Sequence, residues 1–284
     1  MNALAPDACV VSGGAARLRA VRMEKGNKET ETSETPLVDY RPSLATDPGR
    51  RYFDANFELI RFIAFIAQMA SRNDEVQKIA SDALRQFGDD NGDQESEVSP
   101  NKMTEALAEY RRLMAEVVLS RAVDNLLTYI TELLSLVYAE RPETLRSKEQ
   151  VQVDFILGFE SMEELQSAIA ERRVERLSYS GIKDLVDWVN KSLGFVLIPD
   201  HEQLAAIERF VQQRNLIVHN RGVVDRRYVR AQGTVDGVAG HPLNVGGEAV
   251  VSMTLMGTAV SDMDGRAAEK WDLPRSPYPT EEKT

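Results

Sequence analysis

Near the end of a segment with helical periodicity, an arginine and a histidine lie five residues apart, at Arg214 and His219. The apolar residues that lead up to them recur every three or four positions: Leu204, Ile207 and Val211. Arg214 falls on the same stripe, and a guanidinium there is costly to desolvate unless another group pairs with it. The segment is therefore a candidate site built around a cation that needs a partner.

An imidazole beside a guanidinium is suited to phosphodiester cleavage without a metal. His219 is expected in the last turn of a helix, where the dipole favours the protonated ring, and it can exchange a proton near neutral pH. The ring would handle the proton of a 2′-hydroxyl or of the leaving oxygen, while Arg214 would stabilise the charge that builds on the phosphate. Asn215 lies one helical turn before His219 and could hydrogen-bond and orient the ring. Attack by a 2′-hydroxyl would leave a 2′,3′-cyclic phosphate.

The same two residues also fit a structural role. A lone arginine on a helix is usually an ion-pair partner, and a histidine in a last turn is often a simple C-terminal cap. Five helical residues span about 140° of rotation and about 7.5 Å of rise, so the two side chains do not stack on each other. They share a cleft only if Arg214 swings towards the helix end and a second helix or a second protomer supplies the opposite wall.

The charge of the chain is uneven. The net charge of -11 over 284 residues argues against general nucleic-acid coating, which needs a basic surface. Acidic residues gather between 88 and 98, whereas residues 221–230 hold four arginines against Asp225 alone: Arg221, Arg226, Arg227 and Arg230. This local basic patch is compatible with a structured RNA, whose phosphate backbone Arg221, Arg226 and Arg227 would hold. It is also compatible with a solvated loop after a helix, which is the more common meaning of such a charge pattern.

The composition argues against several kinds of site. Cys9 is the single cysteine and the chain has three histidines, so we expect no intrachain disulfide, no metal site and no cofactor. No apolar run approaches the roughly 20 residues of a membrane span. The arginines between 17 and 22 follow a weakly apolar start, which is the reverse of a secretory signal. These absences favour a cytoplasmic protein of bacterial type.

Helical periodicity over most of the chain predicts an all-α protein. Residues 1–48 are rich in Gly, Ser, Thr, Pro and charge, which predicts a flexible leader. A helical domain is expected over 49–257, with an acidic, turn-rich loop at 88–98 inside it. Residues 258–284 are expected to form a short helix and a tail.

Two long helices are expected in the first half of the chain. Residues 52–87 have apolar side chains at helical spacing, which predicts one helix, or two with a break near Ser71–Asp74. The aromatic residues of this stripe are expected in the core: Phe53, Phe57 and Phe65. The next helix should begin at Ser99-Pro100 and end at Arg141-Pro142, because proline is favoured at a first helical position and disfavours helix before it. A kink near Ser120 is the alternative to one continuous helix.

Three shorter helices carry cap signals. Ser161 begins a capping-box pattern, and Ser180 begins a run that Gly194 closes. Asp200 begins the helix that carries the arginine and the histidine, and Gly222 closes it.

The C-terminal part is less regular. Glycines and β-branched residues between 235 and 251 predict a small β-hairpin or loop, and a short helix is expected near Ala267–Trp271. The glycines lack the strand and helix context of a dinucleotide site. His241 lies among them and is expected to be exposed rather than catalytic.

The segment around the two candidate residues resembles the HEPN superfamily. Arg214-Asn215-Leu216-Ile217-Val218-His219 is similar to the Arg-polar-x3-His signature of these small helical domains, many of which are ribonucleases in toxin–antitoxin, abortive-infection and CRISPR-type defence systems. The flanks, Phe210–Gln213 and Asn220–Tyr228, are similar to RiboL-PSP-type and related bacterial HEPN groups. The likeness covers roughly residues 50–230 and is strongest at 204–228.

The resemblance implies a HEPN-like helical bundle with Arg214 and His219 as the catalytic pair and Asn215 as the polar residue that follows the arginine. It implies a homodimer, because HEPN active sites are commonly composites of two motif helices that meet across a twofold axis. The implied function is a metal-independent endoribonuclease, a toxin or effector that acts on RNA and answers to an antitoxin or a defence-system partner. Other superfamily members are scaffolding or nucleotide-binding subunits, so a non-catalytic subunit that binds RNA, nucleotide or a protein is the alternative.

Overall fold

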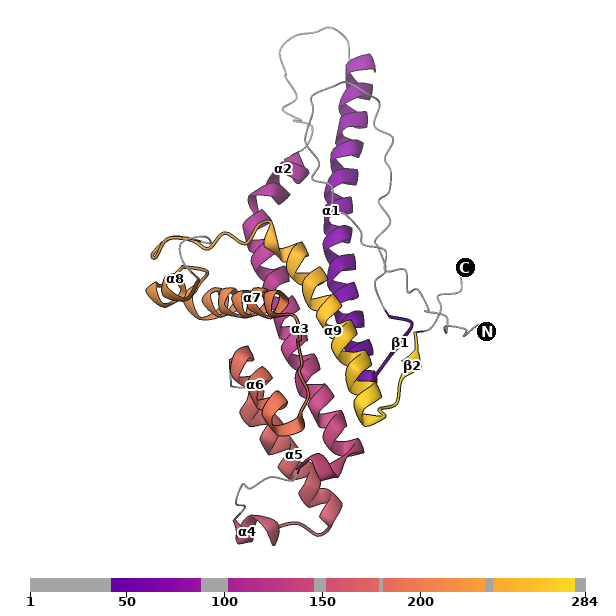
Figure 1. Ribbon diagram of the computed structural model, residues 1–284. Helices are drawn as coiled ribbons and strands as arrows, with labels where there is room; N and C mark the ends of the chain where they lie inside the picture. The colour runs from indigo at the N-terminus through magenta and orange to yellow at the C-terminus, as the bar shows by residue number, and fades with distance from the viewer. Residues whose placement is uncertain (1–41, 88–101, 146–151, 179–180, 233–236, 279–284) are drawn as a thin grey trace, which may run out of the picture. The chain divides into compact units, whose positions relative to one another are not determined.

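The computed structural model describes residues 42–87, 102–145, 152–178, 181–232 and 237–278. These residues are mostly helical, which confirms the all-α prediction for them (Figure 1). Several predicted features lie outside the described residues: the leader up to residue 41, the acidic loop at 88–98, Ser99, Pro100 and Ser180. Within the described ranges, no helix combines the length and the apolar character needed to cross a bilayer.

The described helices, in chain order, are α1 (Asp47–Phe87), α2 (Lys102–Glu109), α3 (Arg111–Glu140), the 3-10 helix η1 (Pro142–Leu145), α4 (Val153–Ile156), α5 (Met162–Ser178), α6 (Ile182–Leu193), α7 (His201–Asn220), α8 (Arg226–Gln232) and α9 (Glu248–Trp271). Two short strands, β1 (Leu44–Ala45) and β2 (Ser276–Pro277), pair antiparallel. Strand β1 and the start of α1 fall inside the stretch expected as leader, so regular structure begins before residue 49.

Helix α3 is the spine of the core. It packs against α1, α5, α7 and α9, and Figure 1 shows α9 alongside it and α7 running across it. Its fully buried apolar residues recur at helical spacing: Leu119, Val123, Leu126, Ile130, Leu133 and Val137. Burying each such side chain stabilises the fold by roughly 1.5–3 kcal/mol relative to exposure. The apolar period of the sequence therefore becomes the central packing surface.

Each long helix was predicted either as one helix or as two, and the structure has one helix in the first case and two in the second. Helix α1 runs without a break through Ser71–Asp74. Asp74 instead caps α2: its carboxylate accepts hydrogen bonds from the amides of Met103 at 2.9 Å and Thr104 at 2.8 Å, and from the Thr104 hydroxyl. The second interruption lies at Tyr110, between α2 and α3, and not near Ser120.

Most predicted helix ends are confirmed. Helix α3 ends at Glu140, immediately before Arg141-Pro142. The Ser161 hydroxyl accepts a hydrogen bond from the Glu164 amide at 3.1 Å, as a capping box requires. Gly194 ends α6 with φ of 58°, and Asp200 caps α7 by accepting from two backbone amides. These ends depend on residues close in sequence.

The C-terminal part confirms the loop alternative for its glycine-rich residues and differs from the prediction in the helix that follows them. Residues 237–247 form a loop with one bridge, between Val223 and Pro242, and no hairpin lies in the described part of 235–251. One helix, α9, then covers 248–271 in place of a hairpin arm and a short helix. Glycine and β-branched residues favour turns and strands locally, but small buried residues such as Ser252 and Gly257 let α9 pack on α3. Tertiary packing overrides the local preference.

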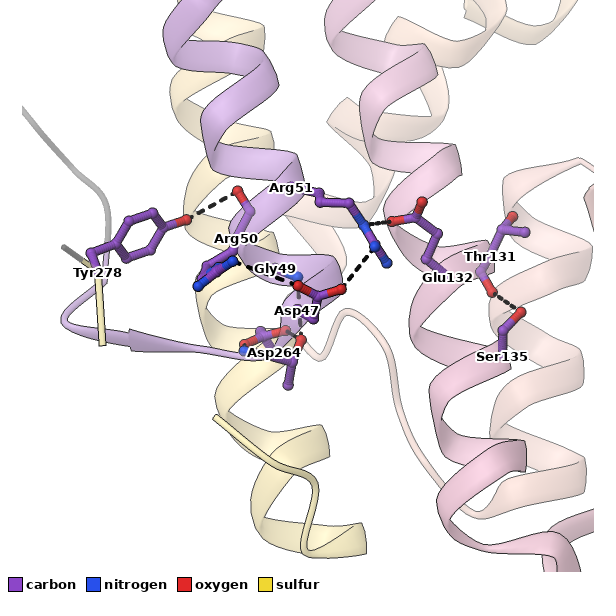
Figure 2. Close-up of polar contacts among 10 residues, drawn as sticks. Asp47, Gly49, Arg50, Arg51, Thr131, Glu132, Ser135, Asp264 and Tyr278 are labelled. Carbon is purple, nitrogen blue, oxygen red and sulfur yellow. Dashed lines mark hydrogen bonds and ion pairs between the residues drawn. The ribbon is translucent and has the colours of Figure 1, made fainter. Parts of the chain in front are cut away.

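A buried carboxylate ties the start of α1 to α9. Asp264 is 2% exposed; it accepts hydrogen bonds from the Thr46 amide at 2.9 Å, the Thr46 hydroxyl at 2.5 Å and the Tyr129 hydroxyl at 3.2 Å. Burial and, secondly, the charge of Asp264 raise the pKa of Tyr129 well above its usual value, so the phenol stays protonated and donates. Figure 2 shows Asp264 close to Gly49, in the first turn of α1. A negative charge in this place also complements the helix dipole.

Around this buried link lies a more exposed set of contacts. Arg51 pairs with Asp47 at 2.7 Å and with Glu132 of α3 at 3.1 Å (Figure 2). The Tyr278 hydroxyl donates to the backbone oxygen of Arg50 at 3.1 Å. The start of α1 is therefore held by α3, by α9 and by the chain that follows β2.

Candidate functional site

Helix α7 positions the predicted pair. Its buried face includes Ile207, Phe210, Val211 and Leu216, and it packs against α3, α6 and α9. The helix ends at Asn220, and Arg221 and Gly222 follow with φ of 54° and 68°. Both residues are in the left-handed region that ends many helices, and the Gly222 amide donates to the Leu216 carbonyl at 3.0 Å.

Arg214 has the partner that its place on an apolar stripe requires. Its Nη2 lies 2.8 Å from Oδ1 of Asp124 on α3, and its Nη1 donates to Oδ1 of Asn215 at 3.3 Å. The arginine side chain is 23% exposed and that of Asp124 is 39% exposed, so the pair is partly solvated and contributes at most about 1 kcal/mol. Its Nε is buried without a hydrogen-bond partner among the described residues. The guanidinium is therefore oriented, but one of its donors is unsatisfied.

His219 is exposed in the last turn of α7. Within the described residues its side chain makes no hydrogen bond and no ion pair. Asn215, which the sequence suggested as the group that orients the ring, uses its amide oxygen on Arg214 instead. Arg214 and His219 thus lie on one helix without a direct hydrogen bond, and the imidazole is open to solvent.

The basic patch lies partly on a helix that the sequence did not predict. Asp225 accepts a hydrogen bond from the Tyr228 amide at 2.6 Å and thereby caps α8, and Tyr228 is buried. Arg221, Arg226 and Arg227 are all exposed, the last two in the first turn of α8. The one acidic residue of the patch therefore has a local structural role. Its residue type was the available sequence signal for the start of α8, because aspartate is a favoured helix N-cap.

Helices α3 and α7, which the ion pair of Arg214 joins, each also carry an exposed apolar side chain. Two contacts hold the end of α7 on α3: the ion pair of Arg214 with Asp124, and a close approach at Gly222, where a Cβ would come within 2.9 Å of a Glu116 carboxylate oxygen. Between the levels of these contacts, Val117 on α3 and Val218 on α7 are both about half exposed. The last turn of α7 thus exposes both apolar and polar side chains, Val218 and His219 among them.

Neither Asp124 nor a second polar link on α7 was predicted from the sequence. Gln213 is fully buried and donates to Glu248 of α9 at 2.6 Å. Both links join residues far apart in the chain, so local periodicity could not find them. His241 is exposed, as expected. Across the described part of the chain, no group of three or more His, Cys, Asp or Glu side chains is arranged to hold a metal ion.

Comparison of the chain with protein-family models, with curated proteins and with solved structures finds no match.

Proposed function

We propose that this chain is a metal-independent endoribonuclease of the HEPN type, in which Arg214 and His219 are the catalytic residues. The observation that carries the proposal is the open imidazole of His219 on the helix that holds an oriented Arg214. A histidine that served only as a cap would be expected to bond a carbonyl of the last turn, and the described residues contain no such bond. The arrangement favours a ring that is available to a substrate.

The reaction needs a base, an acid and a group that stabilises charge. His219 takes the proton of a 2′-hydroxyl, the 2′-oxygen attacks the phosphorus, and the bond from phosphorus to the 5′-oxygen breaks. The leaving oxygen receives a proton, which leaves a 2′,3′-cyclic phosphate and a 5′-hydroxyl. Arg214 stabilises the extra negative charge on the phosphate, and Asp124 and Asn215 hold the guanidinium in place.

A second copy of α7 completes the proposed site. One imidazole per chain cannot be base and acid on both sides of the same phosphorus at once, whereas two copies supply one ring for each task. The exposed Val117 on α3 and Val218 on α7 provide apolar surface for such a contact. Arg221, Arg226 and Arg227 are exposed on the same part of the chain and would hold the phosphate backbone of a bound RNA. Toxin or effector activity in a bacterial cytoplasm, under an antitoxin or defence-system partner, is part of this proposal.

The test is RNA cleavage by the purified full-length protein in EDTA. We expect His219→Ala and Arg214→Ala each to lower the cleavage rate about 10²-fold or more. The exposed His201 and His241 offer matched controls, and His201→Ala and His241→Ala should cleave at the wild-type rate. The product ends should be a 2′,3′-cyclic phosphate and a 5′-hydroxyl. A folded wild-type protein that cuts no RNA, or a His219→Ala variant as active as wild type, contradicts the proposal.

A non-catalytic subunit is the second candidate, and the ion pair of Arg214 favours it. Asp124 already compensates the charge of the guanidinium, as a purely structural arginine would require. Growth on expression separates the two: if the chain is a nuclease, wild type should be toxic, and Arg214→Ala should relieve toxicity while the protein stays folded. If the protein is a scaffold, neither the wild type nor Arg214→Ala is toxic. Arg214→Ala and Asp124→Ala then change only the stability of the fold, by similar amounts.

A further inference from the structure

Residues 62–83 of α1 carry an exposed apolar stripe that the proposed nuclease does not use. Its members are 52–64% exposed: Phe62, Phe65, Met69, Val76 and Ile79. The sequence placed Phe65 in the core with Phe53 and Phe57; Phe53 is buried, but Phe65 is not. Single exposed apolar residues are ordinary, whereas a continuous line of large ones marks a surface that binds something.

The spacing of the stripe is that of a coiled coil. Its residues alternate steps of three and four over three heptads: Phe62, Phe65, Met69, Arg72, Val76, Ile79 and Ala83. A different face of the same helix packs on α2, through the buried Ala70 and through Asp74, which caps α2. Helix α1 therefore has one face occupied by its own chain and a second face that no described residue covers.

We infer that this stripe pairs with the same stripe of a second copy of the chain, as an antiparallel two-helix coiled coil. In that register the six stripe positions from 62 to 79 pair with one another, and Ala83 lies beyond the last pair. Phe62 lies opposite Ile79 of the second copy, Phe65 opposite Val76, and Met69 opposite Arg72. Arg72 lies at the middle of the stripe, where its aliphatic part covers Met69 and its charge reaches water. The inference does not depend on the nuclease proposal.

Charge decides the direction. In the antiparallel register the positions that flank the stripe bring Arg61 beside Asp82 of the second copy, and the twofold axis makes this pair occur twice. A parallel register places Arg72 opposite Arg72 at the same level and pairs no opposite charges across the flanks. Both Arg61 and Asp82 are exposed in the single chain and free to meet a partner.

The area is adequate for a stable dimer. Five large apolar residues, each more than half exposed, offer roughly 500 Å² of apolar surface per copy, and a standard interface buries roughly 800 Å² per partner. The apolar share of that area is close to the usual composition of an interface. The flanking polar residues supply the remainder.

Sedimentation equilibrium of the full-length protein tests the pairing. We expect Phe65→Ser to raise the dimer dissociation constant at least tenfold, with circular dichroism unchanged, because the side chain is exposed in the single chain. Val250→Ser is the matched control: Val250 is an exposed apolar residue of α9, and its loss should leave the constant unchanged. A wild-type monomer at micromolar concentration overturns the inference, as does a Phe65→Ser variant that associates like wild type.

Disulfide trapping tests the direction and separates this surface from an interface at α7. In a Cys9→Ser background, Phe65→Cys and Val76→Cys are made as two separate proteins. Antiparallel pairing predicts that neither protein crosslinks with itself and that a mixture of the two forms a disulfide dimer on mild oxidation. Crosslinking of each variant with itself indicates the parallel register. The absence of a crosslink in the mixture shows that the two stripes do not pair. Both results overturn the inference even if the chain dimerises elsewhere.

A charge exchange provides an independent check. Arg61→Glu and Asp82→Arg should each weaken association, since each places like charges together, and the double variant should restore it towards wild type. Equal effects without restoration contradict the proposed pair.

Discussion

The beginning of α1 and the end of α7 both gather polar side chains, but they use them differently. At the beginning of α1, Asp264 is buried and accepts three hydrogen bonds from Thr46 and Tyr129. At the end of α7, Arg214 is only partly buried, its Nε has no partner among the described residues, and His219 is exposed. A polar group whose partners all lie inside its own chain stabilises the fold. An exposed group that makes no bond in the single chain, as the His219 imidazole does, is available for a ligand or a second copy.

The comparison predicts its largest effect at Asp264. Asp264→Ala leaves the Thr46 amide and hydroxyl and the Tyr129 hydroxyl unsatisfied in the core, so we expect a loss of about 3 kcal/mol or more in the free energy of unfolding. Tyr129→Phe removes one donor and leaves the others, with an expected loss of about 1 kcal/mol. Urea unfolding measures both. If Asp264→Ala loses less free energy of unfolding than Tyr129→Phe does, Asp264 does not stabilise the fold as this comparison requires.

Gly49 should show the next largest effect. A Cβ at this position would lie 2.6 Å from Oδ1 of Asp264, so the carboxylate or α1 must shift, and Gly49→Ala should cost about 1–3 kcal/mol. Gly265 is the matched control, because a Cβ there meets nothing within 4 Å. Gly265→Ala should instead stabilise α9 by about 0.5–1 kcal/mol. Thermal unfolding of the two variants should move in opposite directions.

Asp74 should make the docking of α2 depend on pH. The side-chain hydrogen bond of Thr104, followed by the backbone amides of Met103 and Thr104, holds the pKa of Asp74 below its usual 3.8. Because the folded pKa is the lower one, this stability is present above the unfolded pKa and is lost as the pH falls through the folded value. Protection of the α2 amides, measured relative to their intrinsic exchange rates, should therefore fall in acid in the wild type, and in Asp74→Asn it should be low already at neutral pH. Glu75→Gln, at an exposed neighbour, should change neither.

Arg214 should show the smallest effect on stability. Its partly exposed pair with Asp124 is worth at most about 1 kcal/mol, so Arg214→Ala and His219→Ala should unfold within about 1 kcal/mol of the wild type. If both variants also lose RNA cleavage, the two regions have different roles: the polar groups around Asp264 stabilise the fold, and those at the end of α7 serve catalysis. An unfolding loss at Arg214 as large as that at Asp264 would show that both regions are structural.

Local signals in the sequence were enough to place many helix ends. Pro142 ends α3, Gly194 ends α6, and Asp200 begins α7, because each acts through hydrogen bonds or sterics within a few residues. Local signals did not decide whether α1 breaks near Asp74, and they missed where α9 begins. An aspartate inside α1 resembled a break until its partners on α2 were known, and the glycines and valines before α9 resembled a hairpin.

The sequence by itself determined that the described chain is helical, that Arg214 and His219 share one helix, and where that helix begins and ends. Only the tertiary structure decided that Asp124 holds Arg214, that Asp264 holds Thr46 at the start of α1, and that residues 62–83 of α1 have an uncovered face. The physical reason is separation along the chain: periods and caps act over one or two turns, whereas Asp264 and Thr46 are 218 residues apart. Such partners meet only after the helices have packed, so their pairing is a property of the packed fold.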